Sequence, residues 1–150
     1  MYYDKNSWWR KRNIRIRKTK IKCIGSNRTN ELDNPDKTYM GSKLLNNEFI
    51  GLAYMLDKKM VAGCIISDSS NSIYIEWIFT DDKYRKKGIA SNMLKYIERN
   101  KDIFNRYYSY NFSNIMLEPL DKSIEFYKSN GYRFGSDRYY MRKNISNLKS

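Results

Sequence analysis

The chain has 150 residues, 41% hydrophobic and 15% aromatic, a composition typical of one globular domain with a single core. Histidine is absent and cysteine occurs only twice, which excludes Ser-His-Asp and Cys-His catalysis and argues against a metal site. No apolar run reaches the ~20 residues of a membrane span, and the N-terminus lacks the apolar stretch of a secretory signal. We therefore expect a soluble protein of the cytoplasm, or of the nucleus, that binds no metal ion.

The net charge of +13 is concentrated near the N-terminus. Residues 1–22 contain nine basic side chains and one acidic side chain, so this segment alone carries +8. Such a charge favours nucleic acid or another acidic partner, bound through residues 10–22. The chain is also rich in Lys, Asn, Ile and Tyr, as AT-rich coding would produce, so a purely compositional origin of the charge stays open.

The N-terminal third gives weaker structural signals than the rest. Residues 1–12 are expected to form a basic arm, and residues 13–150 a single domain. Apolar and polar residues alternate from 13 to 24 with one change of phase, which predicts a strand with a bulge or two short strands. Residues 25–37 are rich in turn-forming residues, and residues 38–46 are compatible with a short helix.

The middle of the chain predicts an antiparallel meander followed by a helix. Its three apolar runs are separated by short polar turns and are typical of strands: 49–56, 60–67 and 73–80. The two cysteines, Cys23 and Cys64, each adjoin an isoleucine and are expected to be small apolar strand residues. After Gly88, the apolar residues recur with the 3.6-residue period of a helix that covers a sheet, over 89–97.

The last third predicts a connection, a strand, a helix and a hairpin. Residues 105–111 are expected to be a polar and aromatic connection, and 113–117 a short strand. A helix is expected from about Asp121, as N-cap, to Asn130 and Gly131 at its C-terminus. Residues 132–134 and 138–141 are expected to pair as a final hairpin. These elements predict a single-domain α+β fold with a central, mostly antiparallel mixed sheet flanked by helices.

The basic turn from Tyr84 to Ala90 is the strongest functional signal. It joins a predicted strand to a predicted helix and contains Gly88. A turn of this kind presents backbone N–H groups and the positive end of a helix dipole to an anion. Glycine allows a close approach and a backbone conformation that other residues rarely adopt. The segment therefore predicts a phosphate-binding site, against the plainer alternative of a surface turn with solvated lysines.

Two segments in the right order resemble a known family. The run from Ile75 to Ala90 resembles the acyl-CoA signature of the GCN5-related N-acetyltransferases (GNAT). The run from Phe126 to Tyr132 resembles the second signature of that family, an aromatic-Tyr helix end followed by Gly-aromatic. The resemblance covers about Phe49 to Met141. It implies a GNAT-like fold, with splayed strands that hold acyl-CoA, and acetyl-CoA as cosubstrate.

The resemblance also implies which residues bind the cosubstrate. The backbone of the strand before the turn would pair with pantetheine, and the turn would bind the pyrophosphate. Lys86 stands where the family often has a glycine, and Ala90 replaces another glycine, as is common. The expected cofactor-binding residues are Ile78, Phe79, Thr80, Arg85, Lys86, Lys87, Gly88, Ile89, Ala90 and Ser91.

Amine acetylation needs a proton acceptor for the amine and a proton donor for the departing thiolate. Tyr127 matches the family tyrosine near the sulfur and is the expected acid; its alternative role is core packing. Glu76 and Glu118 are equally good candidates for the general base, and proton transfer through water without a dedicated base is the alternative. Asp121 is expected to cap a helix rather than to react. Two aromatic groups are expected to pack, with acceptor binding or base stacking as the alternative: Tyr107, Tyr108, Tyr110 and Phe112, and Tyr132, Phe134, Tyr139 and Tyr140.

The sequence therefore predicts an N-acetyltransferase whose amine-bearing acceptor, on a protein or a small molecule, is unidentified. Two alternatives stay open because of the basic N-terminus: an acceptor amine linked to nucleic acid, such as aminoacyl-tRNA, and a non-catalytic nucleic-acid-binding module on the same fold. A homodimer is compatible with the sequence.

Overall fold

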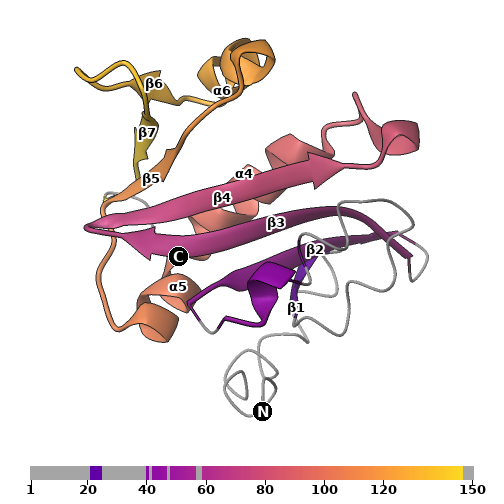
Figure 1. The fold of residues 1–150 in the computed structure, drawn as a ribbon, viewed down its shortest axis with the longest axis horizontal. Coiled ribbons are helices and arrows are strands. Elements are labelled where there is room, and N and C mark those ends of the chain that lie inside the picture. Colours follow the sequence, from indigo (N-terminus) through magenta and orange to yellow (C-terminus); the bar gives the residue numbers. More distant parts are fainter. Residues whose placement is uncertain (1–20, 25–39, 41, 47, 57–58, 147–150) are drawn as a thin grey trace. The chain divides into compact units, whose positions relative to one another are not determined.

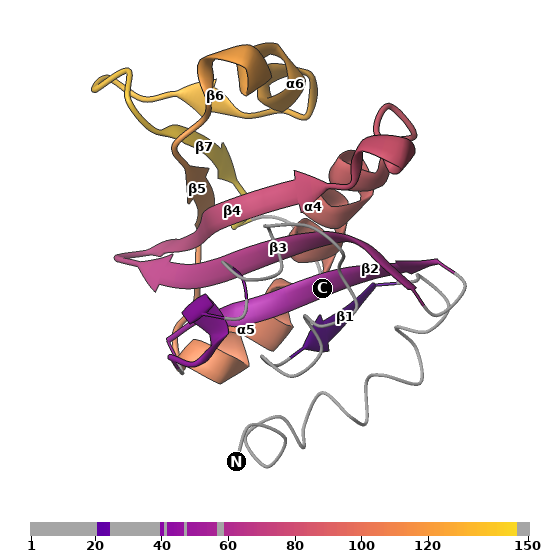
Figure 2. The same cartoon turned by 45° about the vertical axis from the view of Figure 1, so that its right-hand side comes forward.

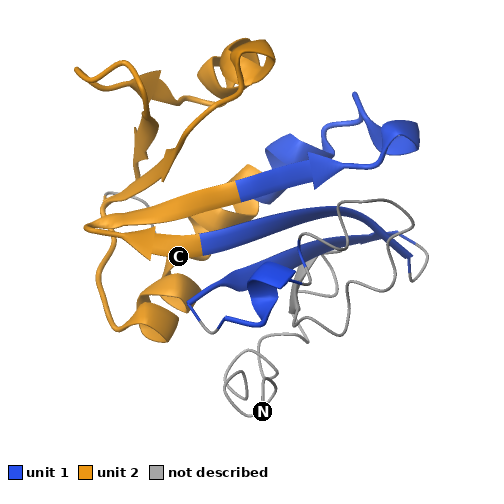
Figure 3. Cartoon of the chain, viewed as in Figure 1, with its two compact units in different colours: residues 1–66, 77–93 blue, residues 67–76, 94–150 orange. Residues whose placement is uncertain are grey.

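The computed structural model describes residues 21–24, 40, 42–46, 48–56 and 59–146. The expected arm at 1–12, the start of the predicted strand at 13–20 and the turn-rich segment at 25–37 lie outside these residues. Hydrogen bonds join the described strands into one mixed sheet in the order β1-β2-β3-β4-β5-β7-β6 (Figure 1). The chain forms two compact units, residues 1–66 with 77–93 and residues 67–76 with 94–150 (Figure 3).

Unit 1, residues 1–66 with 77–93, contains the first strand and most of the second strand of the predicted meander. β1 (Ile21–Ile24) pairs antiparallel with β2 (Ile50–Leu56), which pairs antiparallel with β3 (Lys59–Ser69). The register between β2 and β3 shifts between Tyr54 and Met55. These strands confirm the predicted hairpin, and β1 lies within the segment expected to be a strand.

The core of unit 1 consists of apolar side chains from the meander and from a short helical segment. Residues 40 and 42–44 are helical, which agrees with the helix left open at 38–46. Gly63 of β3 makes room for an aromatic ring, because a Cβ there would lie 2.6 Å from Cζ of Phe79. The cluster comprises Met40, Leu44, Ala53, Met55, Met60, Ile65 and Phe79, with Phe49 and Trp77 packed against it.

Unit 2, residues 67–76 with 94–150, contains the parallel step of the sheet. β4 (Ser72–Thr80) pairs parallel with β5 (Asn114–Leu117) from Ser72 to Ile75. β5 pairs antiparallel with β7 (Met141–Asn144), and β7 pairs antiparallel with β6 (Arg133–Phe134). Figure 2 shows these three short strands in turn beside one another. One parallel pair among antiparallel ones is the mixed sheet that the sequence predicts.

Five described helical elements follow the meander. α4 (Ile89–Arg99) confirms the predicted amphipathic helix and runs two residues further. α5 (Lys101–Tyr108) comes next, and α6 (Ile124–Ser129) is preceded by the short 3₁₀ helix η3 (Asp121–Ser123). Another 3₁₀ turn, η2 (Asp82–Tyr84), precedes α4. No helix among the described residues is long and apolar enough to cross a membrane.

Three predictions for the last third are wrong in detail. Residues 105–108 belong to α5 rather than to a connection. The helix is short, but its apolar residues Ile103 and Phe104 are buried, and this burial stabilises it. Asp121 caps no helix, because α6 begins only after η3 and its N-cap is Ser123. The last strand begins at Met141 rather than at residue 138, because residues 135–140 form a hydrogen-bonded loop.

Candidate active site

The turn between β4 and α4 has a row of unused hydrogen-bond donors. The first helical bond of α4 runs from the N–H of Asn92 to the carbonyl of Gly88, 3.0 Å. Within the described part of the chain, the backbone N–H groups of residues 86 to 91 donate to no protein acceptor. Lys86, Lys87 and Gly88 are exposed to solvent. Six adjacent donors at the positive end of an eleven-residue helix form a site for a polyanion such as a pyrophosphate.

Arg85 fixes the shape of this turn. Its Nε donates to the carbonyl of Thr80, the last residue of β4, at 3.1 Å. Its guanidinium also lies 3.1 Å from the Asp82 carboxylate in an exposed ion pair. The side chain therefore bends back toward its own strand, and the backbone donors that follow it stay available.

Two residues of the turn have left-handed backbone conformations. Gly88 has a φ of +79°, and no heavy atom lies within 4 Å of where a Cβ would be. Lys86 has a φ of +62°, an unfavourable value for a residue with a side chain. The lysine thus occupies a position that glycine would fill without strain.

β4 extends beyond its pairing with β5. The register between the two strands ends at the pair Ile75 and Leu117, whereas β4 continues to Thr80. Ile78 and Thr80, which the family resemblance implies as pantetheine-binding residues, lie in this extension, as does Phe79. Phe79 itself is buried in the core of unit 1, so its side chain serves packing.

Both candidate bases lie in a group of tyrosines within unit 2. Glu76 is half-buried on β4 and accepts a 3.4 Å hydrogen bond from the Ser67 hydroxyl. Glu118 follows β5, and its carboxylate raises the pKa of the nearby Tyr139 hydroxyl. Burial, and then the charge of Glu76, raises the pKa of Tyr74 to about 12; Tyr140, Glu118 and Tyr139 add smaller effects. The negative charges of both carboxylates therefore contribute to the raised pKa of Tyr74.

The ring contacts in this group join β4 to the loop before β7. The Tyr74 and Tyr140 rings meet edge to face with centroids 6.2 Å apart, and those of Tyr139 and Tyr140 at 4.8 Å. Tyr139 is nevertheless 53% exposed. The sequence analysis did not single out Tyr74, although strand alternation places it on the same face as Glu76.

Tyr127, the expected acid, lies on α6 and is 6% exposed. Its ring contacts those of Phe126, at 5.1 Å, and Tyr132, at 6.0 Å. The segment that follows α6 turns back toward Tyr127. The backbone carbonyl of Tyr127 accepts the N–H groups of Asn130 and Tyr132, each at 3.0 Å. Tyr127 is thus held in an aromatic and apolar setting.

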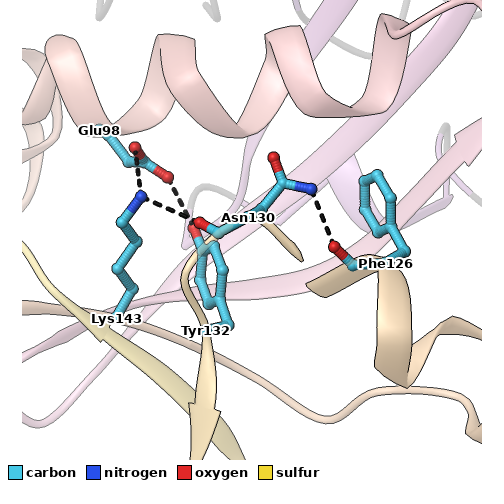
Figure 4. A network of polar contacts seen from close by, with 5 residues as sticks. All are labelled: Glu98, Phe126, Asn130, Tyr132 and Lys143. Carbon is cyan, nitrogen blue, oxygen red and sulfur yellow. Dashed lines mark hydrogen bonds and ion pairs between the residues drawn. The ribbon is translucent and has the colours of Figure 1, made fainter. Parts of the chain in front are cut away.

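An ionic network holds the end of α6 in place (Figure 4). Lys143 Nζ lies 3.0 Å from Oε1 of the buried Glu98 and donates to the Asn130 carbonyl, also at 3.0 Å. The Tyr132 hydroxyl donates to the other Glu98 oxygen at 3.3 Å. The network connects α4, the C-terminus of α6 and β7. Sequence reasoning missed it, because its members lie up to 45 residues apart.

The sequence matches an acetyltransferase (GNAT) domain over residues 41–134, more than half of the chain. The chain belongs to the GNAT acetyltransferase family.

Solved structures of this family have the same fold at low sequence identity. The ribosomal-protein-S18-alanine N-acetyltransferase from Escherichia coli superposes with a TM-score of 0.64 at 15% identity, over 87% of this chain and 98% of its own. Ard1 from Thermoplasma volcanium gives 0.61 at 17%, over 83% and 95%. An aminoglycoside 6'-N-acetyltransferase complexed with coenzyme A gives 0.61 at 14%, over 83% and 96%. No curated protein sequence matches the chain.

This GNAT protein is an acyltransferase, and its family uses acetyl-CoA. The turn from Arg85 to Ser91 fits such a cosubstrate, because its donors are unused and the space above Gly88 is open. Within the described residues, no group of three or more His, Cys, Asp or Glu side chains could hold a metal ion. Cys64 is buried in β3, and burial raises the pKa of its thiol, which confirms its assignment as an apolar strand residue.

The predicted aromatic groups divide between two roles. Tyr107, Tyr108, Tyr110 and Phe112 form a chain of ring contacts with centroids 5.0 to 5.9 Å apart. Phe112 is fully buried within it, which confirms packing for that residue. Tyr132 is buried in the network of Figure 4. Tyr139 is exposed and lies near the Glu118 carboxylate, so packing alone does not account for it.

Proposed function

We propose that residues 13–150 form one N-acetyltransferase domain that transfers the acetyl group of acetyl-CoA to a primary amine of a protein or small molecule. The observation that carries this proposal is the turn after β4, in which six consecutive backbone N–H groups lack an acceptor among the described residues. Side chains contribute little specificity to such a site, because the donors are backbone groups. The family match over residues 41–134 supports the same activity.

The turn would bind the pyrophosphate, with Lys86 and Lys87 adding positive potential at its rim. Ile78 and Thr80 would offer backbone groups to pantetheine, since β4 continues past its last pair with β5. Acetyl-CoA supplies the acetyl group as a thioester. Arg85 contributes by holding the turn through Thr80 rather than by contact with the reacting atoms.

Proton transfer would involve the carboxylates and Tyr127. The acceptor binds as an ammonium ion and must lose a proton before its nitrogen can attack the thioester carbonyl. Tyr74 keeps its own proton at neutral pH, because its pKa is raised to about 12, so it cannot accept this one. Glu76 and Glu118 remain as proton acceptors in the group. Tyr127 would donate a proton to the sulfur as the carbon–sulfur bond breaks.

Acetyl-CoA is expected to raise the melting temperature of the wild-type protein. At about 100 times its Kd, a ligand stabilises by about 2.7 kcal/mol, which corresponds to a shift of about 5 to 10 °C for a chain of this size. Thermal unfolding with and without acetyl-CoA measures the shift. Pantetheine, which lacks the pyrophosphate, should give a much smaller one. The absence of a shift with excess acetyl-CoA would remove the proposed function.

Two variants at Lys86 separate charge from backbone strain in the same assay. Lys86→Ala and Lys86→Gly both remove the ammonium group, but only glycine adopts a positive φ without cost. Lys86→Gly should therefore be the more stable of the two by about 1 kcal/mol. Gly88→Ala should weaken acetyl-CoA binding, because alanine is strained at a φ of +79°. Equal stability of the two Lys86 variants would show that the turn relaxes without strain.

A second candidate function is favoured by one observation, the charge of +8 in residues 1–22. The acceptor amine would then be linked to nucleic acid, as in aminoacyl-tRNA, and the basic segment would bind phosphates. Neutralising five basic residues within 10–22 should reduce the slope of log binding constant against log salt by about 4 for RNA. An unchanged slope, or no binding, would leave this charge without a role in acceptor binding.

A further inference from the structure

The loop between β6 and β7 is held in one conformation by its own hydrogen bonds. Asp137 Oδ1 accepts the backbone N–H groups of Tyr139, at 2.8 Å, and Tyr140, at 3.2 Å. The N–H of Gly135 donates to the Tyr140 carbonyl at 3.2 Å, and that of Arg138 donates to the Gly135 carbonyl at 3.1 Å. Arg138 adopts a φ of +57° within this loop. A carboxylate that accepts two consecutive N–H groups fixes a turn without burying any side chain.

The loop determines where two tyrosines lie. The Tyr139 hydroxyl lies near the Glu118 carboxylate, which raises its pKa, and the Tyr140 ring lies edge to face with that of Tyr74. The two rings stand at 90° to each other. Tyr139 is 53% exposed, so its ring is accessible to a ligand while it contacts the Tyr140 ring. Glu118 is likewise exposed, so both groups can reach a ligand.

We propose that Asp137 is a positioning residue for the acceptor: it orders the loop so that Tyr139, Tyr140 and Tyr74 form an aromatic wall beside Glu118 that binds a cationic amine. The inference rests on the proposed function, since it needs an amine acceptor. An ammonium ion is attracted both by a carboxylate and by the faces of aromatic rings. Asp137 itself touches neither the acceptor nor the cosubstrate.

The contacts of Asp137 separate this role from simple support of the fold. Its other partner is Arg142, at 3.7 Å, in a half-exposed ion pair that contributes little to stability. The backbone N–H groups of Tyr139 and Tyr140 hold the pKa of its carboxyl below the ordinary value. The carboxylate therefore remains ionised at neutral pH, and acid releases the loop only below the ordinary range of an aspartate. Removal of its side chain should loosen the loop locally and leave the core of the protein intact.

The test compares Asp137→Ala with Asp137→Asn, whose amide oxygen can accept the same two N–H groups. Acetyl transfer is followed as release of the CoA thiol with three probe amines: spermidine, kanamycin and a peptide that begins with alanine. Asp137→Ala should raise the KM of the best probe about ten-fold, which corresponds to about 1.4 kcal/mol. The KM for acetyl-CoA and the melting temperature should stay unchanged. Asp137→Asn should recover most of the loss, and Glu125→Ala, which removes an exposed carboxylate of α6, should have no effect.

A second measurement observes the loop directly. Amide hydrogen exchange at Tyr139 and Tyr140, followed by NMR, should accelerate in Asp137→Ala and stay slow in Asp137→Asn. An active wild-type protein with an unchanged acceptor KM in Asp137→Ala would overturn the inference and leave the proposed function standing. Wild-type protein that binds acetyl-CoA but acetylates none of the three amines would overturn both.

Discussion

Simultaneous replacement of Glu76 and Glu118 by glutamine is expected to lower kcat/KM for acetyl transfer by about 10³, within the range of general base catalysis. Both carboxylates raise the pKa of Tyr74. With a pKa of about 12 this hydroxyl stays protonated at neutral pH, so it cannot be the proton acceptor. Glutamine preserves the size of the side chain and can still accept the hydrogen bond from Ser67, but it cannot act as a base. Steady-state kinetics of CoA thiol release, with a probe amine at several pH values, measure the effect.

The single variants identify which carboxylate acts. If Glu76 is the base, Glu76→Gln alone should reproduce nearly the whole loss and remove the acidic limb of the pH–rate profile, and Glu118→Gln should mainly raise the acceptor KM. The reverse pattern would assign the base to Glu118. Tyr127→Phe should also lower kcat, but it should leave the acidic limb in place and the acetyl-CoA KM nearly unchanged. A double variant as active as wild type would show that water relays suffice.

Local sequence patterns predicted the strand, turn and helix that we propose bind the cosubstrate, because all their determinants are adjacent in the chain. An apolar strand, a basic segment with Gly88 and an amphipathic helix follow one another within about twenty residues, and the structure has them at β4, the turn and α4. The left-handed backbone of Lys86 could not be predicted, since the sequence shows a lysine where glycine is expected. The structure shows that Lys86 adopts a left-handed conformation, with a φ of +62°.

The acceptor side was less predictable because its residues come from distant segments. Glu76 and Glu118 were named from their strands, but their common neighbour Tyr74 emerges only once β4 pairs parallel with β5. Asp137 reads as an ordinary turn residue in the sequence. Its role depends on two backbone donors that exist only after residues 135–140 form a loop, and the same loop explains why the last strand begins three residues later than predicted.

Replacement of Lys143 by methionine is expected to destabilise the protein by about 2 to 3 kcal/mol, below the full cost of breaking a buried ion pair because the lysine is half-buried. The melting temperature should fall by about 5 to 10 °C. The change leaves the carboxylate of Glu98 buried without its cation and removes the donor to the Asn130 carbonyl at the end of α6 (Figure 4). Thermal or urea unfolding measures it. Lys128→Met, which breaks an exposed pair with Glu125, is the matched control and should change stability by less than about 0.5 kcal/mol.

A second substitution tests whether the loss comes from the uncompensated charge. Adding Glu98→Leu to Lys143→Met removes that charge and should restore part of the stability, since apolar replacements of a buried pair are often close to neutral. A double variant less stable than Lys143→Met would show that the hydrogen bond from Tyr132 to Glu98 matters more than the charge. The outcome bears on catalysis, because the Tyr127 carbonyl accepts the N–H groups of Asn130 and Tyr132. A network that secures those two residues also secures the proposed acid, so Lys143→Met should lower kcat even at temperatures where it remains folded.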